Sequence, residues 1–331
     1  MSIKVWHRPE DIPSDLAGTV VTIGVFDGVH KGHRAVLKET VRQAKECGLA
    51  SVALTFDPHP ATVHSKVNVH LVSTLDDRID RLAAAGISAV YVQKYTLEYA
   101  KSSPREFVER QLVGELKAHA VVVGEDVRFG CHNAGDGAVL VELGAELGID
   151  VTLVSDLTAP EGRRWSSTWV RELLASGDVA GAARVLGRRH RIRGEVVHGF
   201  QRGRAIGFPT ANLTGDNLGE VPADGVYAGW LVRSVEGAPA AEYLPAAISV
   251  GTNPHFAGRD RTVEVHVLGR SDLNLYGEPI AVDFVEYLRP MLSFDSLEGL
   301  LDQMDEDLRS TAEILGVPTA GRVDPAAVTA V

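Results

Sequence analysis

The feature that most constrains the fold is a regular alternation of short apolar segments with amphipathic ones through the first half of the chain. The apolar segments predict five strands, at residues 19–26, 51–56, 89–95, 120–124 and 149–157. The amphipathic segments predict helices at residues 33–47, 74–86, 102–116 and 137–148. Apolar strands separated by helices are typical of a parallel, doubly wound sheet that is covered on both faces. We therefore expect the first half to be an α/β domain.

The pattern changes near residue 187. Two short helices are expected before it, at residues 166–177 and 178–187. After it, strands are expected at residues 191–199, 225–235, 246–251, 261–269 and 279–288. The clearest of them alternates Val263, Val265 and Val267 with polar residues. An alternation with period two indicates strands buried on one face, and this succession predicts a small antiparallel β-barrel.

One long helix follows the predicted barrel and is expected to close it. Asp295 is expected to cap this helix, with Glu298 three residues further on. The apolar stripe of the helix consists of Leu297, Leu301, Met304, Leu308, Ala312 and Leu315.

The length of the chain predicts more than one domain. A chain of 331 residues exceeds what a single hydrophobic core usually organises. We expect an α/β domain at residues 1–186 and an all-β domain at residues 187–331, with residues 317–331 as a frayed tail.

Composition limits the classes of partner. The net charge is −11 and no long basic segment occurs, which disfavours a nucleic-acid-binding protein. We see no apolar run of membrane-spanning length and no signal peptide, so no membrane association is expected. Cys47 and Cys131 have no metal-ligand spacing, which fits a reducing cytoplasm. Local cations and backbone N–H groups could still bind a small anion.

The first strand–helix junction carries two histidines, in the segment GVFDGVHKGH at residues 24–33. A helix N-terminus at such a junction offers unpaired N–H groups and a positive dipole end, which suit phosphate. His30 and His33 can donate hydrogen bonds to phosphate, while Gly24, Gly28 and Gly32 leave room for it. The glycine spacing is neither that of a P-loop nor that of a dinucleotide fingerprint. The alternative is a helix cap with two exposed histidines.

A second helix start is rich in hydroxyl groups, in the segment RRWSSTWVR at residues 163–171. Ser166 or Ser167 is expected to cap the helix, and Arg164 and Arg171 flank it. Hydroxyl groups and an arginine pair at a helix start suit a triphosphate. An ordinary N-cap is the alternative.

These two segments together resemble the nucleotidyltransferase superfamily. With TFDPHP at residues 55–60 and GEDVRFG at residues 124–130, the first half resembles the adenylyltransferase module of the prokaryotic bifunctional riboflavin kinase/FMN adenylyltransferase (FAD synthetase) family. The resemblance covers nearly the whole chain. It implies a Rossmann-like module that joins AMP from ATP to FMN and releases pyrophosphate.

The resemblance implies a role for each matching residue. His30 and His33 would hold the ATP phosphates and be catalytic. The full implied ATP set is Gly24, Phe26, Asp27, His30, His33, Arg164, Ser167, Thr168 and Arg171. The implied flavin set is Pro58, His59, Pro60, Asp126 and Phe129. The chain departs from the family pattern at Val127, where an aromatic residue is usual, and at Trp165 and Trp169.

The second half contains GFPTAN at residues 207–212. Side chains two residues apart in an extended chain point to the same side, so Thr210 and Asn212 could bind one Mg²⁺. A polar turn is the alternative for this motif alone. DGVYAG, SVGTNPHF and TVEVHVLG follow in order. Together they resemble the riboflavin kinase domain of the same family.

This second resemblance implies that Glu264 is the catalytic base. Alternation alone would make Glu264 an outward, solvated strand residue. The implied ATP and flavin set is Gly207, Phe208, Pro209, Thr210, Asn212 and Arg289, with Thr210 and Asn212 as the Mg²⁺ ligands.

The expected function is therefore phosphorylation of riboflavin to FMN by the second domain and adenylylation of FMN to FAD by the first. Mg²⁺ is the expected cofactor, ATP the co-substrate, and riboflavin and FMN the substrates. No nucleic acid or membrane partner is expected, and a homo-oligomer is left open. The alternatives are a riboflavin kinase with weak or lost adenylyltransferase activity and a non-catalytic flavin-binding protein. Another adenylyltransferase would lack the GFPTAN barrel, and a tRNA synthetase-like protein would need a basic surface.

Overall fold

The protein divides into two compact units, Met1–Ser167 and Thr168–Val331. The computed structural model describes residues 3–65, 69–198, 203, 206–213, 218–235, 240–252 and 261–327. Residues 253–256 of the SVGTNPHF motif lie outside the described residues. The domain boundary predicted at 186/187 stays a prediction.

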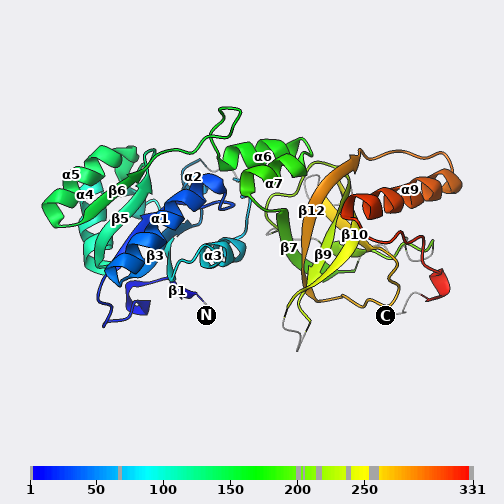
Figure 1. Ribbon diagram of the computed structural model, residues 1–331, viewed down its shortest axis with the longest axis horizontal. Coiled ribbons are helices and arrows are strands. Elements are labelled where there is room, and N and C mark those ends of the chain that lie inside the picture. Colours follow the sequence, from blue (N-terminus) through cyan, green and yellow to red (C-terminus); the bar gives the residue numbers. More distant parts are fainter. Residues whose placement is uncertain are drawn as a thin grey trace. The chain divides into compact units, whose positions relative to one another are not determined.

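The first unit contains a six-stranded parallel sheet with the strand order β1-β4-β3-β2-β5-β6 (Figure 1). The strands are β1 (Lys4–Trp6), β2 (Thr19–Ile23), β3 (Ala50–Asp57), β4 (Ala89–Lys94), β5 (Ala118–Gly124) and β6 (Asp150–Val154). The predicted parallel α/β sheet is confirmed. The sequence analysis missed β1, because three residues are too few to show a period.

Helices cover both faces of this sheet. The helices are α1 (Lys31–Cys47), α2 (Pro60–Ser65), α3 (Leu75–Ala84), α4 (Pro104–Phe107) and α5 (Gly137–Leu147), together with the π-helix η3 (Val108–Glu115) and the 3₁₀ helices η1 (Pro9–Asp11), η2 (Tyr99–Lys101) and η4 (Cys131–Asn133).

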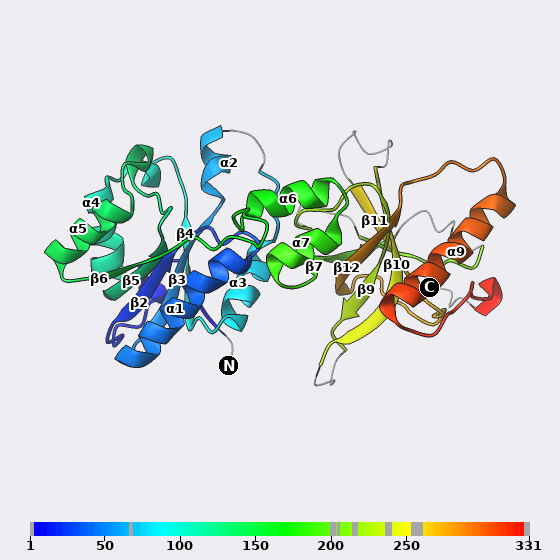
Figure 2. The same cartoon turned by 45° about the horizontal axis from the view of Figure 1, so that its top comes forward.

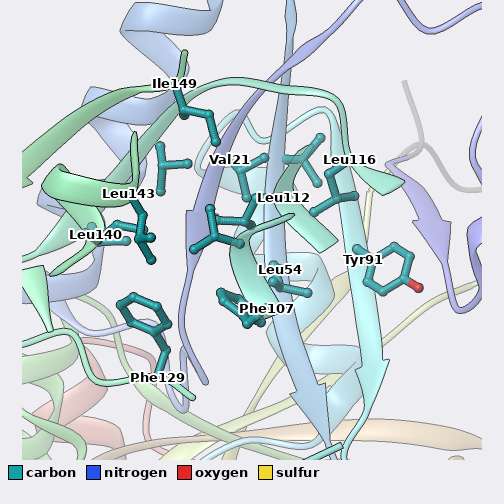
Figure 3. Packing of buried hydrophobic residues seen from close by; sticks show 14 of the residues in the cluster. Val21, Leu54, Tyr91, Phe107, Leu112, Leu116, Phe129, Leu140, Leu143 and Ile149 are labelled. Carbon is teal, nitrogen blue, oxygen red and sulfur yellow. The ribbon is translucent and has the colours of Figure 1, made fainter. Parts of the chain in front are cut away.

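Consecutive strand residues face opposite layers of helices. Ala53 of β3 packs in a cluster with Leu37 of α1 and Leu82 of α3. The next residue, Leu54, packs in a cluster with Leu112 of η3 and, on α5, with Leu140 and Leu143 (Figure 3). The strands are therefore buried on both faces, as their continuous apolar character predicts.

The helix predicted at residues 102–116 is not one regular α-helix. It begins with a capping box between Ser103 and Glu106. From Val108 it winds as a π-helix, and the Leu116 N–H donates to the carbonyl of Gln111, five residues back. The apolar spacing of this segment does not distinguish the wider turn from an α-helix.

The second unit contains a closed antiparallel barrel with the strand order β10-β11-β8-β7-β12-β9 (Figure 2). The strands are β7 (His190–Val197), β8 (Ala211–Leu213), β9 (Gly225–Arg233), β10 (Glu242–Thr252), β11 (Arg261–Val267) and β12 (Pro279–Arg289), and α6 (Ser167–Ala175) and α7 (Val179–Leu186) precede them. The predicted barrel is confirmed. The sequence analysis missed β8, a strand of three residues that follows Pro209.

Helix α9 (Leu297–Leu315) packs against β9, β10 and β12 (Figure 2). Its cap is Ser296, whose hydroxyl accepts the Gly299 N–H at 3.1 Å, so the prediction of Asp295 as cap is wrong. Leu308 and Ala312 are buried, as the apolar stripe predicts, but Leu297 is 59% exposed.

The segment after α9 corrects part of the prediction of a frayed tail at residues 317–331. Val317 and Ala320 pack against the core under α9, and the Val323 N–H donates to the Gly207 carbonyl at 3.1 Å. The 3₁₀ helix η5 (Pro325–Ala327) lies near the end of the described chain. Among the described residues, no helix is long and apolar enough to cross a bilayer.

Replacing the cap of α9 should loosen its first turn. Ser296→Ala removes the hydroxyl that accepts the Gly299 N–H, and a lost N-cap costs about 1 kcal/mol. Amide hydrogen exchange in residues 297–303 should therefore become about five-fold faster in Ser296→Ala. Hydrogen-exchange mass spectrometry measures this rate. Asp295→Ala is the matched control, and a larger effect from Asp295→Ala would restore the original cap assignment.

Candidate functional site

The first unit has a cavity of about 460 Å³ at the carboxyl end of its parallel strands. Ile23, Phe56, Gly124 and Val154, at or next to the ends of four strands, line it. The predicted site residues that line it are Gly24, Phe26, His30, His33, Pro60, Asp126, Phe129 and Arg164. This edge is where ligands bind in open α/β sheets.

His30 is the N-cap of α1. Its Nδ1 accepts the His33 N–H at 3.4 Å, and the two rings stack with centroids 3.6 Å apart and planes at 21°. Because Nδ1 accepts, a neutral His30 carries its proton on Nε2 and can donate it to a ligand. The cap therefore orients the histidine and also sets its tautomer.

Gly32 makes this stacked arrangement possible. A Cβ atom at Gly32 would lie 3.2 Å from the His30 ring and 3.4 Å from the carbonyl oxygen of Trp165. A side chain at position 32 would therefore crowd the His30 ring, which would have to shift by a few tenths of an ångström.

The pKa of His33 is well below its ordinary value. Burial is the largest cause, and electrostatic repulsion from His30 when it is protonated and from Arg164 and Arg78 adds to it. Without an anion nearby, the His33 imidazole is neutral at neutral pH. Its Nδ1 is buried and has no hydrogen-bond partner among the described residues.

Asp27 and Ser167 are placed differently from the prediction. Asp27 is buried, and its carboxylate accepts the N–H groups of Val72 and Ser73, each at 3.2 Å. The Ser167 hydroxyl donates to the Asp27 carbonyl oxygen at 2.8 Å. Neither residue lines the cavity. They connect the histidine junction to the start of α6, and this brings Trp165 and Ser166 to the cavity wall.

Arg164 points a charged group at the cavity. It pairs with Asp126, and its Nε lies 3.2 Å from the Asp156 carboxylate. Asp126, which the resemblance assigns to flavin, is thus engaged with Arg164. Asp156, which lies two residues after the end of β6, was not predicted as a site residue.

Aromatic residues also line the cavity. Tyr95 and Tyr99 line it with Phe56, and the Tyr95 ring meets the Phe56 ring edge-on at 5.8 Å. The sequence analysis missed these three residues, although each lies at or just after the end of β3 or β4. Val127 also lines the cavity.

The remaining predicted flavin residues have different positions. Phe129 is buried and packs against Phe107 at 5.5 Å. Pro60 lines the cavity, whereas Pro58 and His59 do not. The His59 Nδ1 accepts the Ala61 N–H at 3.0 Å.

Thr168 and Arg171 belong to the second unit. Within it, the Arg171 guanidinium lies 3.5 Å from the Thr168 hydroxyl. Their assignment to ATP stays a prediction.

The second unit has a cavity of about 240 Å³ between the barrel and α9. Thr210, Glu264 and Arg289 line it on the barrel side, and Met304 and Leu308 line it on the helix side. Phe208 also lines this cavity, while Pro209 lines a smaller cavity of about 40 Å³.

The structure brings Thr210, Asn212 and Glu264 together. Glu264 of β11 lies opposite Asn212 of β8 in the strand register, so their side chains share a face. The Asn212 amide nitrogen lies 3.5 Å from the Thr210 hydroxyl. Burial raises the pKa of Glu264, and a hydrogen bond with the Thr210 side chain opposes this increase.

Arg289 is bound by a residue that sequence reasoning missed. Its Nε and Nη2 donate to the two carboxylate oxygens of Asp307 at 2.8 and 2.6 Å. Asp307 also accepts from Gln303 at 3.1 Å. Since Asp307 and Gln303 belong to α9, this ion pair ties the helix to the end of β12.

Gly207 lies where the chain turns toward Thr210. Its φ is +85°, and a Cβ atom there would lie 2.5 Å from the Val323 carbonyl oxygen. Both the backbone conformation and the close approach require glycine.

The donors in the second cavity fit Mg²⁺. The Thr210 hydroxyl, which lines the cavity, and the amide oxygen of the neighbouring Asn212 are hard oxygen ligands of the kind that this ion prefers. In the described part of the chain, no group of three or more His, Cys, Asp or Glu side chains could hold a metal. Hard oxygen donors suit an ion that also binds nucleotide phosphates and water.

Two family models match the chain in succession. Residues 12–169 match FAD synthetase, and residues 186–315 match riboflavin kinase. A relative from Escherichia coli strain K12, described as a bifunctional riboflavin kinase/FMN adenylyltransferase, is 36% identical over 95% of this chain and 98% of its own. A relative from Listeria monocytogenes with the same description is 35% identical over 88% of this chain and 91% of its own.

A solved structure has a similar fold along nearly the whole chain. It comes from Streptococcus pneumoniae and is described as a macrolide-efflux protein. The TM-score is 0.82 at 28% identity, with 94% of this chain and 99% of the other covered.

The histidine pair generates a prediction about pH. In the ligand-free protein, His33 should titrate below about 6.5, because burial disfavours its charged form. Between the folded and unfolded pKa values the unfolded chain binds more protons at this site. The site therefore destabilises the fold as the pH falls below the unfolded value. Histidine NMR measures the titration, with the resonance assigned by its loss in His33→Gln. A midpoint at or above about 6.5 would contradict the prediction.

Proposed function

Since the chain belongs to the bifunctional riboflavin kinase/FMN adenylyltransferase family, we propose that its two cavities are the two active sites of that enzyme. The enzyme phosphorylates riboflavin to FMN and adenylylates FMN to FAD. The adenylyl step is assigned to the cavity of the first unit and the kinase step to the cavity of the second. One observation carries this assignment: His30, His33, Asp126 and Arg164 line the first cavity, and Thr210, Glu264 and Arg289 line the second.

The first cavity suits adenylyl transfer without a covalent enzyme intermediate. A phosphate oxygen of FMN attacks the α-phosphorus of ATP, the bond from that phosphorus to the bridging oxygen breaks, and pyrophosphate leaves. His30 can donate its Nε2–H to a phosphate, and Arg164 can offset negative charge. The start of α1 adds its N–H groups and dipole. These residues align and neutralise the reactants.

The aromatic wall supports the flavin side of this assignment. Phe56, Tyr95 and Tyr99 line the same cavity as the two histidines and add an aromatic part to its wall. An isoalloxazine ring is a flat, largely apolar group that aromatic side chains can contact. The cavity therefore offers one surface to flavin and another to phosphate.

The second cavity suits transfer of the γ-phosphoryl group. Glu264 accepts the proton of the riboflavin 5′-hydroxyl while that oxygen attacks the γ-phosphorus and ADP leaves. Burial raises the Glu264 pKa, which makes the carboxylate a stronger base. Thr210 and Asn212 would hold Mg²⁺, which neutralises phosphate charge when bound.

We assign the enzyme to the cytoplasm and place the functional boundary at 186/187. The riboflavin kinase match starts at residue 186, which supports the boundary. Cys47 and Cys131 are unpaired thiols, which supports a reducing compartment.

Removing the base should separate the two activities. Glu264→Gln keeps the size of the side chain but cannot accept the proton. FMN formation from riboflavin should fall by about 10²–10⁴-fold. FMN-to-FAD conversion should stay within about two-fold, because the first cavity does not contain Glu264. Chromatography of the products measures both rates, and a comparable loss of both activities would refute the assignment.

Adding a side chain at Gly32 should lower the adenylyltransferase activity. Gly32→Ala brings a methyl group against the His30 ring. The displaced imidazole should lower FAD formation by roughly 10–100-fold while FMN formation persists. Lys38→Ala, on an exposed position of the same helix, is the control. Wild-type FAD formation by Gly32→Ala would remove the stacked histidines from the mechanism.

A further inference from the structure

Thr210 lies at the end of the barrel's hydrogen-bonded ladder. The pairing of β8 with β11 begins at Ala211, which lies opposite Val265. Thr210 precedes Ala211 and is outside the strand. The residue before it, Pro209, has no N–H group to donate to a neighbouring strand. The position of the Thr210 hydroxyl must therefore depend on another anchor.

His266 supplies that anchor. It lies two residues after Glu264 on β11, so both side chains are on the same face of the strand. Its Nδ1 lies 2.9 Å from the carbonyl oxygen of Pro209. A carbonyl oxygen can only accept, so Nδ1 carries the proton and donates it.

The His266 ring is a neutral donor. The residue is 4% exposed, and its Nε2 is buried with no hydrogen-bond partner among the described residues. A second proton would place an uncompensated charge there, and burial accordingly lowers the pKa of His266. The ring is thus suited to holding the carbonyl and is not suited to proton transfer.

The neighbouring contacts make this anchor rigid. The His266 ring packs against Phe208 with centroids 5.3 Å apart. Phe208 is buried in the core under α9 with Leu308 and Ala312. The segment before β8 is therefore held at Phe208 by packing and at Pro209 by a hydrogen bond. Together these contacts fix the backbone direction from Pro209 to Thr210.

We propose that His266 is a positioning residue of the kinase site. By holding the Pro209 carbonyl, it places the Thr210 hydroxyl against Glu264 and beside Asn212. This inference rests on the proposed function of the second cavity. Without the donor, the Pro209–Thr210 peptide plane is free to rotate, and the hydroxyl leaves its place. Because Thr210 is assigned to Mg²⁺–ATP, the effect falls on the nucleotide and not on riboflavin.

Two variants of matched shape test the proposal. Asn bears an N–H donor one bond from Cγ, where His bears Nδ1, whereas Leu has the same branching without a donor. In His266→Leu, the KM for Mg²⁺–ATP in the kinase reaction should rise about ten-fold, the effect of a lost hydrogen bond of about 1.4 kcal/mol. The KM for riboflavin should change by less than about two-fold, since packing apart from the hydrogen bond is largely kept. His266→Asn should restore the KM for Mg²⁺–ATP to within about three-fold of the wild type.

The results that overturn the proposal are distinct. An unchanged KM for Mg²⁺–ATP in His266→Leu, equal damage in His266→Asn and His266→Leu, or an equal rise in the KM for riboflavin would each refute it. FAD formation by the first unit of the same chain reports whether each variant is folded there, and circular dichroism reports the barrel. If kinase activity survives in Glu264→Gln, the proposed function fails. If it is lost there but His266→Leu behaves as the wild type, only this inference fails.

A ligand-free measurement tests the geometry independently of activity and of the folding of variants. The ¹⁵N chemical shifts of His266 in the wild-type protein should report a neutral ring with its proton on Nδ1. A ring protonated on Nε2 alone would remove the hydrogen bond to Pro209 and with it the proposal.

Discussion

The hydrogen bond from the His33 N–H to the His30 Nδ1 organises the cavity that we propose as the adenylyl-transfer site. It caps α1 after the loop that follows β2, the two imidazoles stack beside it, and a neutral His30 carries its proton on Nε2 because Nδ1 accepts. The same hydrogen bond therefore caps the helix and orients the His30 side chain. A chain that lost this cap would lose the orientation of the site before it lost the sheet behind it, because the strands are buried by their own apolar clusters.

The two units position the polar side chains at their cavities in different ways. In the first, a helix start places the phosphate-binding groups, and a buried Asp27 fixes the loop around them through the N–H groups of Val72 and Ser73. In the second, a three-residue strand places Asn212 opposite Glu264. A short strand fixes fewer positions than a helix, so the neighbouring residue Thr210 depends on a side-chain contact from β11.

Much of this arrangement could be predicted from the sequence, because strand and helix periods and the HKGH and PTAN segments are local. The long-range partners could not. Nothing near Arg289 in sequence indicates that it pairs with Asp307 on α9, and Asp156 gives no local sign of its contact with Arg164. The prediction of the α9 cap was wrong by one residue. Asp295 and Ser296 are both residue types that cap helices well, and the backbone conformation places the serine at the N-cap position. Tyr95 and Tyr99 were missed because aromatic residues beyond a strand look like ordinary packing.

The contacts of Arg164 have a consequence for the turnover cycle. In the ligand-free protein the guanidinium already has anionic neighbours, Asp126 and Asp156. A phosphate that reaches it exchanges places with carboxylates instead of meeting a bare cation, so the gain in attraction is a difference between two anions. In the adenylyl transfer that we propose, the Arg164 side chain can return to Asp126 and Asp156 when pyrophosphate departs, so that no unpaired charge remains. Ion pairs that form again in the ligand-free state lower the affinity of Arg164 for pyrophosphate and favour its dissociation.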